Sequence, residues 1–376
     1  MALRHLLITG AVAAGIALAG PAAAREFQMA NFVGPKGVIA DGNDVFMKMM
    51  NEGTDGEFTF ENSYGGLLLD ATQMLEGVPN GVADIGYLNA PYFQGEFPEF
   101  NLIANMGLVG KDAAAMGGAI MEYVTTCDLC LAELHGNGHV YLGSHSTLAY
   151  RMQGRSGFSN AEELKGLKLR TALPSQGRWA EHFGAVRVAL SGGEAFEAIS
   201  TGLVDGALAA LTEFYTLNLG DIATDISMTE VGVFNGTSPF SFGVPQWQEL
   251  TDEHRAMFIE AATYGNATMI ANAYREESRA LAEAEEKGMT LHHPSPEFVK
   301  AHNAFIEQDV QTGIEESVRT TGVENAQEKV DRYLALIDKW RKLADGVDKT
   351  DADALGKLYM DEIWSKVDPA TYGMGK

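Results

Sequence analysis

The residue best placed for chemistry in this sequence is an arginine at the end of an apolar strand. Leu167 and Leu169 predict a short strand that ends at Arg170. The helix before that strand is signalled by the S-x-x-E spacing of Ser159 and Glu162. Ligands of open α/β sheets bind at the carboxyl ends of strands. A guanidinium there can hold a carboxylate through two parallel hydrogen bonds, so Arg170 is our candidate for binding an acid.

The segment from Ser159 to Leu211 contains the elements that must position this arginine. It predicts helices alternating with strands, including an amphipathic helix from about Gln176 to Phe183 and a strand that begins at Val204. A similar pattern occurs earlier, because N-G-V-A-D-I-G around Asp84 matches T-G-L-V-D-G-A around Asp205. We expect each aspartate to cap or turn the backbone at the start of a strand. The chain is therefore predicted to be α/β with two similar halves.

Three short runs in this part of the chain carry a family resemblance. L-K-G-L-K-L-R, followed by F-G-A-V-R-V and G-x-V-D-G, resembles the DctP family of solute-binding proteins, which serve tripartite ATP-independent periplasmic (TRAP) transporters. The resemblance extends from about Phe27 to Ala280. It implies a two-lobed periplasmic binding protein fold with a hinge, a ligand cleft and a long helix toward the C-terminus. It also implies that Arg170 pairs with the carboxylate of the substrate.

The two lobes are expected to alternate along the chain. We assign residues 25–145 and about 237–285 to lobe I, residues 146–236 and about 286–345 to lobe II, and residues 346–376 to a C-terminal helical extension. The crossings are placed near Tyr141 to Tyr150 and near Val231 to Pro239. A helix is expected to start at Thr251, and a long helical pattern runs from Thr268 to Lys287.

The first residues have the pattern of a secretory signal peptide. Arg4 precedes an apolar run from Leu6 to Leu18, and small residues from Ala22 to Ala24 follow. We expect cleavage after Ala24 and export to the periplasm. No later apolar stretch is long enough to span a bilayer, so direct membrane insertion is not expected.

The charge balance restricts the possible partners. The 376 residues carry a formal net charge of −24. Nucleic acid and anionic membrane surfaces are therefore excluded as expected partners. A negative protein that binds an anion must do so through local positive groups, which adds weight to Arg170.

The two cysteines allow more than one interpretation. Cys127 and Cys130 form a C-x-x-C pair, with His135 and His139 close behind. The alternatives are a local disulfide, two packed thiols, or metal or redox chemistry completed by the histidines. Export to an oxidising compartment favours a disulfide, and zinc sites usually have a longer gap before the histidines. We predict a structural role and no cofactor.

The resemblance also implies further residues that contact the ligand. In lobe I, the positions that match the ligand-facing residues of the family are Asn31, Tyr64, Asp70, Tyr87 and Asn89. A second basic residue often stands about twenty residues before the strand-end arginine in the family. Tyr150 falls at that spacing, and we prefer its neighbour Arg151 over Arg155. Tyr87 has an equally good interpretation as a core residue.

Aromatic residues after the strands of lobe II suggest the shape of the ligand. Trp179, Phe214 and Tyr215 follow strands, and with Tyr64 and Tyr87 opposite they could enclose a flat ring. Each of them is also a reasonable core residue.

Two departures from the family pattern bear on ligand class. Some members of the family carry an asparagine where this chain has Ala209, and others carry an E-W pair where this chain has Glu213 followed by Phe214 and Tyr215. We therefore disfavour sialic acid and metal-chelated oxo-acids. We predict a monocarboxylate, with aromatic acids ahead of short aliphatic acids and well ahead of sugar acids.

The expected function is that of a non-enzymatic receptor, a monomer or dimer, that delivers an organic acid to a TRAP membrane permease. The sequence contains no G-x-S-x-G, H-E-x-x-H or Gly-rich phosphate loop. The alternatives are a periplasmic metal-binding protein or enzyme that uses Cys127, Cys130, His135 and His139, and a binding protein of an ABC transporter.

Overall fold

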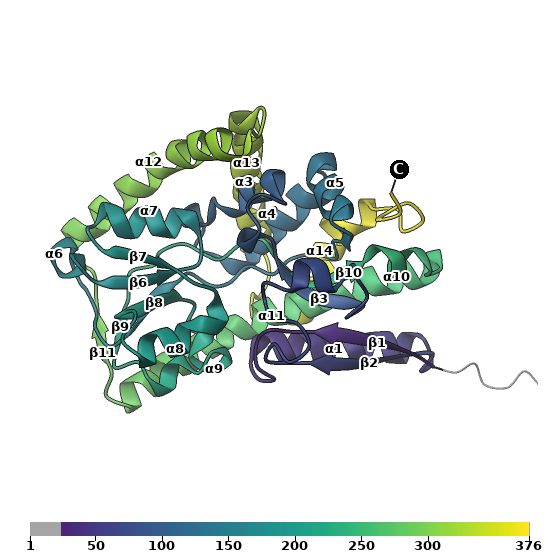
Figure 1. Ribbon diagram of the computed structural model, residues 1–376, viewed down its shortest axis with the longest axis horizontal. Coiled ribbons are helices and arrows are strands. Elements are labelled where there is room, and N and C mark those ends of the chain that lie inside the picture. The colour runs from purple at the N-terminus through teal and green to yellow at the C-terminus, as the bar shows by residue number, and fades with distance from the viewer. Residues whose placement is uncertain (1–23, 376) are drawn as a thin grey trace, which may run out of the picture.

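Two separate β-sheets organise the chain in a computed structural model that describes residues 24–375 (Figure 1). Apart from Ala24, the predicted signal peptide lies outside the described residues. One sheet belongs to lobe I and the other to lobe II. The two-lobed α/β prediction is therefore confirmed.

The sheet of lobe I has the strand order β2-β1-β3-β10-β4. Its strands are β1 (Arg25–Ala30), β2 (Phe58–Ser63), β3 (Ile85–Asn89), β4 (His139–Val140) and β10 (Thr237–Gly243). β1 pairs parallel with β2 and β3, whereas β10 pairs antiparallel with β3 and β4. Phe27 in β1 is fully buried and packs edge-on against Phe58, Phe242 and Phe258, so the centre of this lobe is an aromatic cluster.

The sheet of lobe II has the strand order β11-β9-β5-β8-β6-β7. Its strands are β5 (Arg151–Gly154), β6 (Lys168–Thr171), β7 (Val186–Ala189), β8 (Gly206–Ala209), β9 (Asp225–Ser227) and β11 (Thr290–His292). β6 lies between β7 and β8 and is parallel to both. Arg170 thus stands near the end of a strand that has a parallel neighbour on each side.

The two aspartates of the repeated pattern have equivalent roles. The carboxylate of Asp84 accepts a hydrogen bond from the backbone of Gln28 at 2.8 Å, and that of Asp205 accepts one from the backbone of Lys168 at 2.8 Å. Each aspartate also donates its own backbone N–H to the same partner residue. Both residues therefore fix the start of a strand against its neighbour, as the repeated sequence pattern predicts.

Helices surround both sheets. The longer ones are α1 (Val38–Gly53), α4 (Ala113–Thr125), α11 (Asp252–Glu286), α12 (Pro296–Thr321), α13 (Ala326–Ala344) and α14 (Ala352–Glu362). The shorter ones are α2 (Met74–Gly77), α3 (Pro98–Ala104), α5 (Asp128–Gly136), α6 (Ala161–Leu164), α7 (Pro174–His182), α8 (Ala195–Ser200), α9 (Glu213–Thr216) and α10 (Val244–Gln248). Single 3₁₀ turns occur at η1 (Ala90–Tyr92), η2 (Gly107–Val109), η3 (Gly192–Glu194), η4 (Leu219–Asp221) and η5 (Trp364–Lys366).

The lobes are joined by two strand-to-strand segments and by a helix. The segments between β4 and β5 and between β9 and β10 are hydrogen-bonded to each other through Tyr150, Val231 and Gly232. Helix α11 begins against α1 in lobe I and ends with Ala280 and Ala284 in a hydrophobic cluster of lobe II. The two helical segments expected around Thr251 and Thr268 are one continuous helix.

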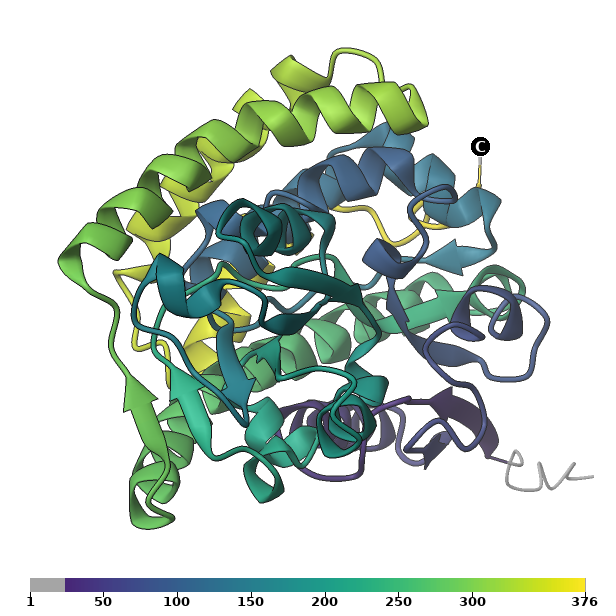
Figure 2. The same cartoon turned by 60° about the vertical axis from the view of Figure 1, so that its left-hand side comes forward.

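The C-terminal helices differ in their placement from the sequence-based assignment. Figure 2 shows α12 running along the outer edge of the molecule. It packs on α7 in lobe II and on α3 in lobe I, and α13 then packs on α4 of lobe I. The sequence-based assignment places residues up to about 345 in lobe II. The apolar stripe that contains Val330, Tyr333 and Ile337 predicts a buried helix face, but helical periodicity does not identify which lobe covers that face.

Trp340 anchors this C-terminal segment to lobe I. Its ring is fully buried, and its Nε1 donates a hydrogen bond to Glu122 at 2.7 Å. A Cβ on Gly118 would lie 2.2 Å from the ring, so only glycine permits this approach of α13 to α4. Tyr359 in α14 donates to the carbonyl of Ala114 at 2.9 Å. The predicted C-terminal extension is thus part of the lobe I core.

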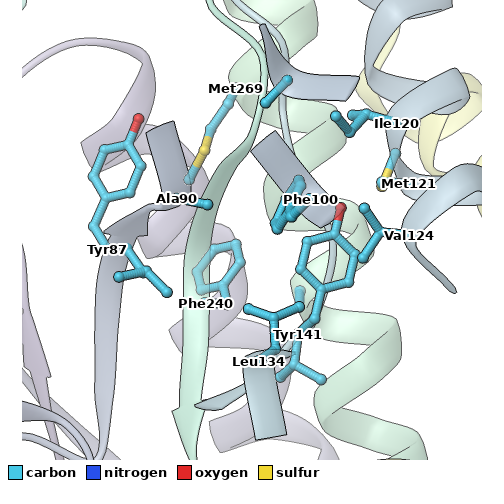
Figure 3. Close-up of a cluster of buried hydrophobic side chains, with 14 of the residues drawn as sticks. Tyr87, Ala90, Phe100, Ile120, Met121, Val124, Leu134, Tyr141, Phe240 and Met269 are labelled. Atoms are coloured by element: carbon cyan, nitrogen blue, oxygen red, sulfur yellow. The ribbon is translucent and has the colours of Figure 1, made fainter. Parts of the chain in front are cut away.

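The lobe I core extends to the edge that faces lobe II. Figure 3 shows Phe100, Tyr141 and Phe240 among the labelled side chains, with Tyr87 at one edge and its hydroxyl pointing away from the others.

Within residues 24–375, no helix is both long enough and apolar enough to cross a membrane.

We predict that Trp340→Ala destabilises the protein by about 3–5 kcal/mol, because it removes a fully buried ring and leaves Glu122 without its indole partner. Urea unfolding followed by circular dichroism measures this loss. Val318→Ala, at a side chain that is 47% exposed on α12, is the control and should change the unfolding free energy little. A Trp340→Ala protein as stable as the wild type would show that α13 does not belong to the lobe I core.

Candidate functional site

A cavity lies between the lobes and takes its walls from both. Lobe I contributes Phe32, Val33, Val38, Ile39, Tyr87, Asn89 and Tyr92, the crossing segments contribute His145, Thr147, Tyr150 and Phe234, and lobe II contributes Arg170, Gly192, Thr212, Glu213, Thr216 and Leu217. The cavity measures about 60 Å³. A ligand enclosed here must be small.

Arg170 is the buried cation of this cavity. Its side chain is 1% exposed, its Nε donates to the carbonyl of Leu190 at 3.0 Å, and its Nη1 donates to the carbonyl of Leu208 at 3.1 Å. These two carbonyls lie next to the strands on either side of β6 and fix the plane of the guanidinium. No described residue accepts a hydrogen bond from Nη2, so one edge of the fork remains available to a ligand.

Glu213 brings a carboxyl group into the same cavity. Its Oε1 accepts a hydrogen bond from the hydroxyl of Tyr150 at 3.3 Å, whereas its Oε2 is buried without a partner. Burial raises the pKa of Glu213 to about 7, although Arg170 and the Tyr150 hydroxyl favour the charged form. Among the described residues, Arg170 and Glu213 line one cavity and form no ion pair with each other.

Polar side chains from lobe I and the crossing segment complete the wall. Asn89 is 4% exposed, and its Oδ1 is buried without a partner. Burial raises the pKa of the Tyr87 hydroxyl well above its usual range, so Tyr87 is neutral and able to donate a hydrogen bond. Burial also lowers the pKa of His145 to about 3, so this imidazole is neutral.

The lobes touch each other at the mouth of the cavity. The backbone N–H of Gly192 in lobe II donates to the hydroxyl of Tyr92 in lobe I at 3.2 Å. Gly37 in lobe I has a φ of 84°, and a Cβ there would lie 2.5 Å from Cγ2 of Thr216 in lobe II. Only glycine therefore tolerates both this backbone conformation and this approach. The structure shows the lobes closed over the cavity.

Three of the sequence-predicted residues line this cavity together, and they come from both lobes. They are Arg170, Tyr87 and Asn89. Arg170 stands near the end of β6 and Asn89 is the last residue of β3, whereas Tyr87 lies in the middle of β3 rather than after it.

The other lobe I candidates lie elsewhere. Asn31 is buried and donates to Asn62 at 2.8 Å within lobe I. Tyr64 is only partly buried, and burial raises the pKa of its hydroxyl, with a hydrogen bond to Asn43 opposing. Asp70 is exposed and accepts hydrogen bonds from the turn that follows it. All three follow strands or lie in loops, but none of them lines the cavity.

Arg151 forms ion pairs outside the cavity, in contrast to its expected role. It pairs with Glu230 at 3.0 Å and also with Glu277 of α11. Successive side chains of an extended segment point to opposite faces, so Tyr150 lines the cavity and its neighbour Arg151 points to the other side. The spacing seen in the family falls on Tyr150, which lines the cavity. The preference for its charged neighbour Arg151 as a cavity residue was therefore wrong.

The expected aromatic walls from lobe II are also displaced. Trp179 is fully buried in the lobe II core, where its Nε1 donates to His302 at 2.9 Å. Phe214 packs with Ile226, and the hydroxyl of Tyr215 donates to Glu283 at 3.0 Å. These side chains sit on helices after strands, and their direction around a helix could not be read from strand ends. Besides Tyr87, the cavity is lined by four aromatic residues that were missed as ligand walls, namely Phe32, Tyr92, Tyr150 and Phe234.

The cysteines form a local disulfide between Cys127 and Cys130 at the start of α5. His139 is engaged elsewhere, because its ring nitrogens contact Ser241 at 2.9 Å and the carbonyl of Leu75 at 3.0 Å. Burial lowers the pKa of His139 to about 4. In the part of the chain that the structure describes, no three Cys, His, Asp or Glu side chains are grouped to hold a metal ion.

Comparisons with known proteins agree on one family. The model of the DctP family, described as bacterial extracellular solute-binding protein, family 7, matches residues 29–317. A "solute-binding protein" of Verminephrobacter eiseniae is 23% identical over 256 residues, which are 66% of this chain and 73% of that protein.

Two solved structures are similar to most of this chain. A TRAP solute-binding protein of Rhodoferax ferrireducens in complex with copurified benzoate has a TM-score of 0.75 and 18% identity, and the match covers 85% of this chain and 99% of that one. A marine metagenome TRAP solute-binding protein specific for aromatic acid ligands, with 3-hydroxybenzoate, has a TM-score of 0.74 and 19% identity over 84% and 99% of the two chains. At this identity the likeness shows the fold alone.

The raised pKa of Glu213 predicts how its substitution changes stability with pH. The folded protein favours the neutral carboxyl group of Glu213 over the charged one. The stability that the neutral group contributes is therefore fully present below pH 4.5, the ordinary pKa of a glutamate. That contribution is lost as the pH rises to about 7, the raised pKa in the folded state. We predict that Glu213→Gln gains stability relative to the wild type between pH 4.5 and 7, as measured by urea unfolding. A difference between the two proteins that stays constant with pH would contradict the raised pKa.

Proposed function

The chain belongs to the DctP family of bacterial extracellular solute-binding proteins, and we propose that it binds a small organic acid in the periplasm and delivers it to a TRAP-type membrane permease. The observation that carries this proposal is the buried Arg170, which presents a free guanidinium edge to a cavity shared by two lobes. Reversible capture needs such a cavity and a charge to hold the ligand, and it needs no covalent chemistry. The family match favours a TRAP partner over an ATP-driven transporter.

The charge of Arg170 indicates an anionic ligand. A buried cation is costly unless a counter-charge and hydrogen bonds satisfy it. Its described partners are two neutral backbone carbonyls, which satisfy hydrogen bonds but supply no negative charge. A ligand carboxylate would supply both, through charge-assisted hydrogen bonds to the free edge of the fork.

The walls of the cavity favour a flat, compact acid. Phe32 and Tyr87 stack with ring centroids 4.9 Å apart, and Tyr150 and Phe234 stack at 6.4 Å. All four line the cavity, so they take the role first expected of Trp179, Phe214 and Tyr215. Aromatic walls contribute on the order of 0.5–1.5 kcal/mol per well-placed ring pair beyond burial. We therefore keep the proposal of a monocarboxylate, with small aromatic acids ahead of sugar acids.

We predict that Arg170→Ala weakens binding of the acid by at least about 2 kcal/mol, a factor of about 30 in Kd, because the carboxylate would be buried without its cation. Arg170→Lys keeps the charge but loses the fork, so its affinity should be intermediate. Isothermal calorimetry on the mature chain measures both effects.

The matched control for Arg170 is Arg187, an exposed arginine on the neighbouring strand β7 that does not line the cavity. Arg187→Ala should bind as the wild type does. Arg170 also donates hydrogen bonds to two backbone carbonyls, so its loss affects the folded state as well as the cavity. Thermal melting of each variant therefore separates lost binding from lost folding. Wild-type affinity in a folded Arg170→Ala protein would remove the basis of the proposal.

We predict that ligand binding closes the lobes. The cross-lobe contacts at Tyr92, Gly192 and Thr216 form only in the closed arrangement, and a ligand that touches both walls favours that state by its differential affinity. Small-angle X-ray scattering should give a smaller radius of gyration with saturating ligand than without it. Equal radii for free and saturated protein would contradict closure by the ligand.

A further inference from the structure

We propose that Glu213 determines specificity by accepting a hydrogen bond from the ligand, so that the preferred ligand is an organic acid that carries a hydroxyl or N–H group in addition to its carboxylate. This inference rests on the proposed function, since it concerns the same cavity. It goes beyond that function by assigning a second recognition group and by disfavouring acids that have no donor.

Unpartnered acceptors in the cavity wall carry the argument. Oε2 of Glu213 and Oδ1 of Asn89 are buried and accept no hydrogen bond from a described residue. A buried acceptor without a donor costs about 1–3 kcal/mol, and such atoms are rare in folded proteins. Because both residues line the cavity, a ligand that brings a donor would relieve this cost.

His145 adds a third acceptor, as its hydrogen bonds fix its tautomer. The hydroxyl of Thr237 donates its one proton to the carbonyl of His145 at 2.5 Å. The contact of 3.1 Å between that hydroxyl and Nδ1 of His145 then requires Nδ1 to be the donor. Nε2 of this neutral, cavity-lining imidazole therefore carries a lone pair. The cavity wall therefore includes three acceptors, from Glu213, Asn89 and His145.

The opposite charges of the cavity are also left unpaired with each other. Arg170 comes from β6, Glu213 begins α9, and no ion pair joins them among residues 24–375. Tyr150 donates to Glu213 from the crossing segment, and Tyr87 on β3 lies close enough for Glu213 to add to the burial that raises the pKa of the Tyr87 hydroxyl. A ligand with both a carboxylate and a donor group would satisfy Arg170 and Glu213 at once.

This role of Glu213 does not depend on its charge. Burial holds its pKa near 7, so both forms of the carboxyl group occur around neutral pH. The carboxylate accepts through either oxygen, and the protonated form still accepts through its carbonyl oxygen. Glu213 can therefore accept a hydrogen bond from the ligand in both its charged and its protonated form.

The test compares pairs of acids that differ by the donor. Isothermal calorimetry on the mature chain would use benzoate against 3-hydroxybenzoate, propionate against lactate, and cyclopentanecarboxylate against pyroglutamate. In at least one pair that binds, we expect the acid with the donor to bind at least tenfold more tightly, since a site built around a buried polar group rejects the analogue that leaves it unpaired.

Two substitutions at Glu213 separate recognition from folding. Glu213→Leu removes the acceptor, so the preference within a pair should fall toward one while the acid without the donor keeps or gains affinity. Glu213→Gln keeps an acceptor oxygen in the same shape and should retain part of the preference. Glu197→Leu, on the exposed face of α8 outside the cavity, is the control and should leave the ratio unchanged. If Glu213→Leu does not fold, the affinity ratios within each pair of acids, measured for the wild type and for Glu213→Gln, still test the role of Glu213.

The outcomes distinguish this inference from the function on which it rests. Equal affinity of the two members of every binding pair, or a preference that persists in Glu213→Leu, would overturn the role of Glu213 and leave the receptor function standing. No binding of any of the six acids would contradict the proposed function, and this inference with it.

Discussion

A buried guanidinium that forms no ion pair with a described residue is the constraint on which this structure depends. Arg170 is almost completely enclosed, and the protein offers it two neutral carbonyls, from Leu190 and Leu208. A charge in such a place persists only when its surroundings are rigid and when an anion can join it. The sheet of lobe II provides the rigidity, since β6 lies between two parallel neighbours. The opposite lobe and the crossing segments enclose the space in which we propose that the anion binds.

Closure of the lobes links this local electrostatic requirement to the whole molecule. Tyr92 and Gly192 meet across the mouth, and Gly37 allows Thr216 to approach. The path between lobes runs through two hydrogen-bonded segments and through α11, which has a part in each lobe. A ligand that contacts Arg170 from one side and the lobe I wall from the other favours this arrangement over an open one, because only the closed arrangement provides both sets of contacts.

The sequence predicted the parts of the site that depend on local rules. A strand end identified Arg170, and the repeated glycine and aspartate pattern identified the equivalent roles of Asp84 and Asp205. The sequence did not show which of two neighbouring side chains points into the cavity. Arg151 was preferred, but Tyr150 lines the cavity. The alternation of an extended segment was the signal that could have corrected this choice.

Other misplacements arose where the sequence specifies an element but not its partner. Trp179 follows the strand that ends near Arg170, yet its ring turns into the lobe II core and binds His302. Helix α13 has a clear apolar stripe, yet lobe I rather than lobe II covers it. Tertiary packing decides both, and periodicity carries no information about it.

The most direct test of this account is a crystal structure of the mature chain with the acid that binds most tightly. The account predicts that the ligand occupies the cavity between the lobes, with a carboxylate oxygen about 2.7–2.9 Å from Nη2 of Arg170. A carboxylate held elsewhere, for example by Arg151, or a ligand bound outside this cavity, would contradict the central role of Arg170.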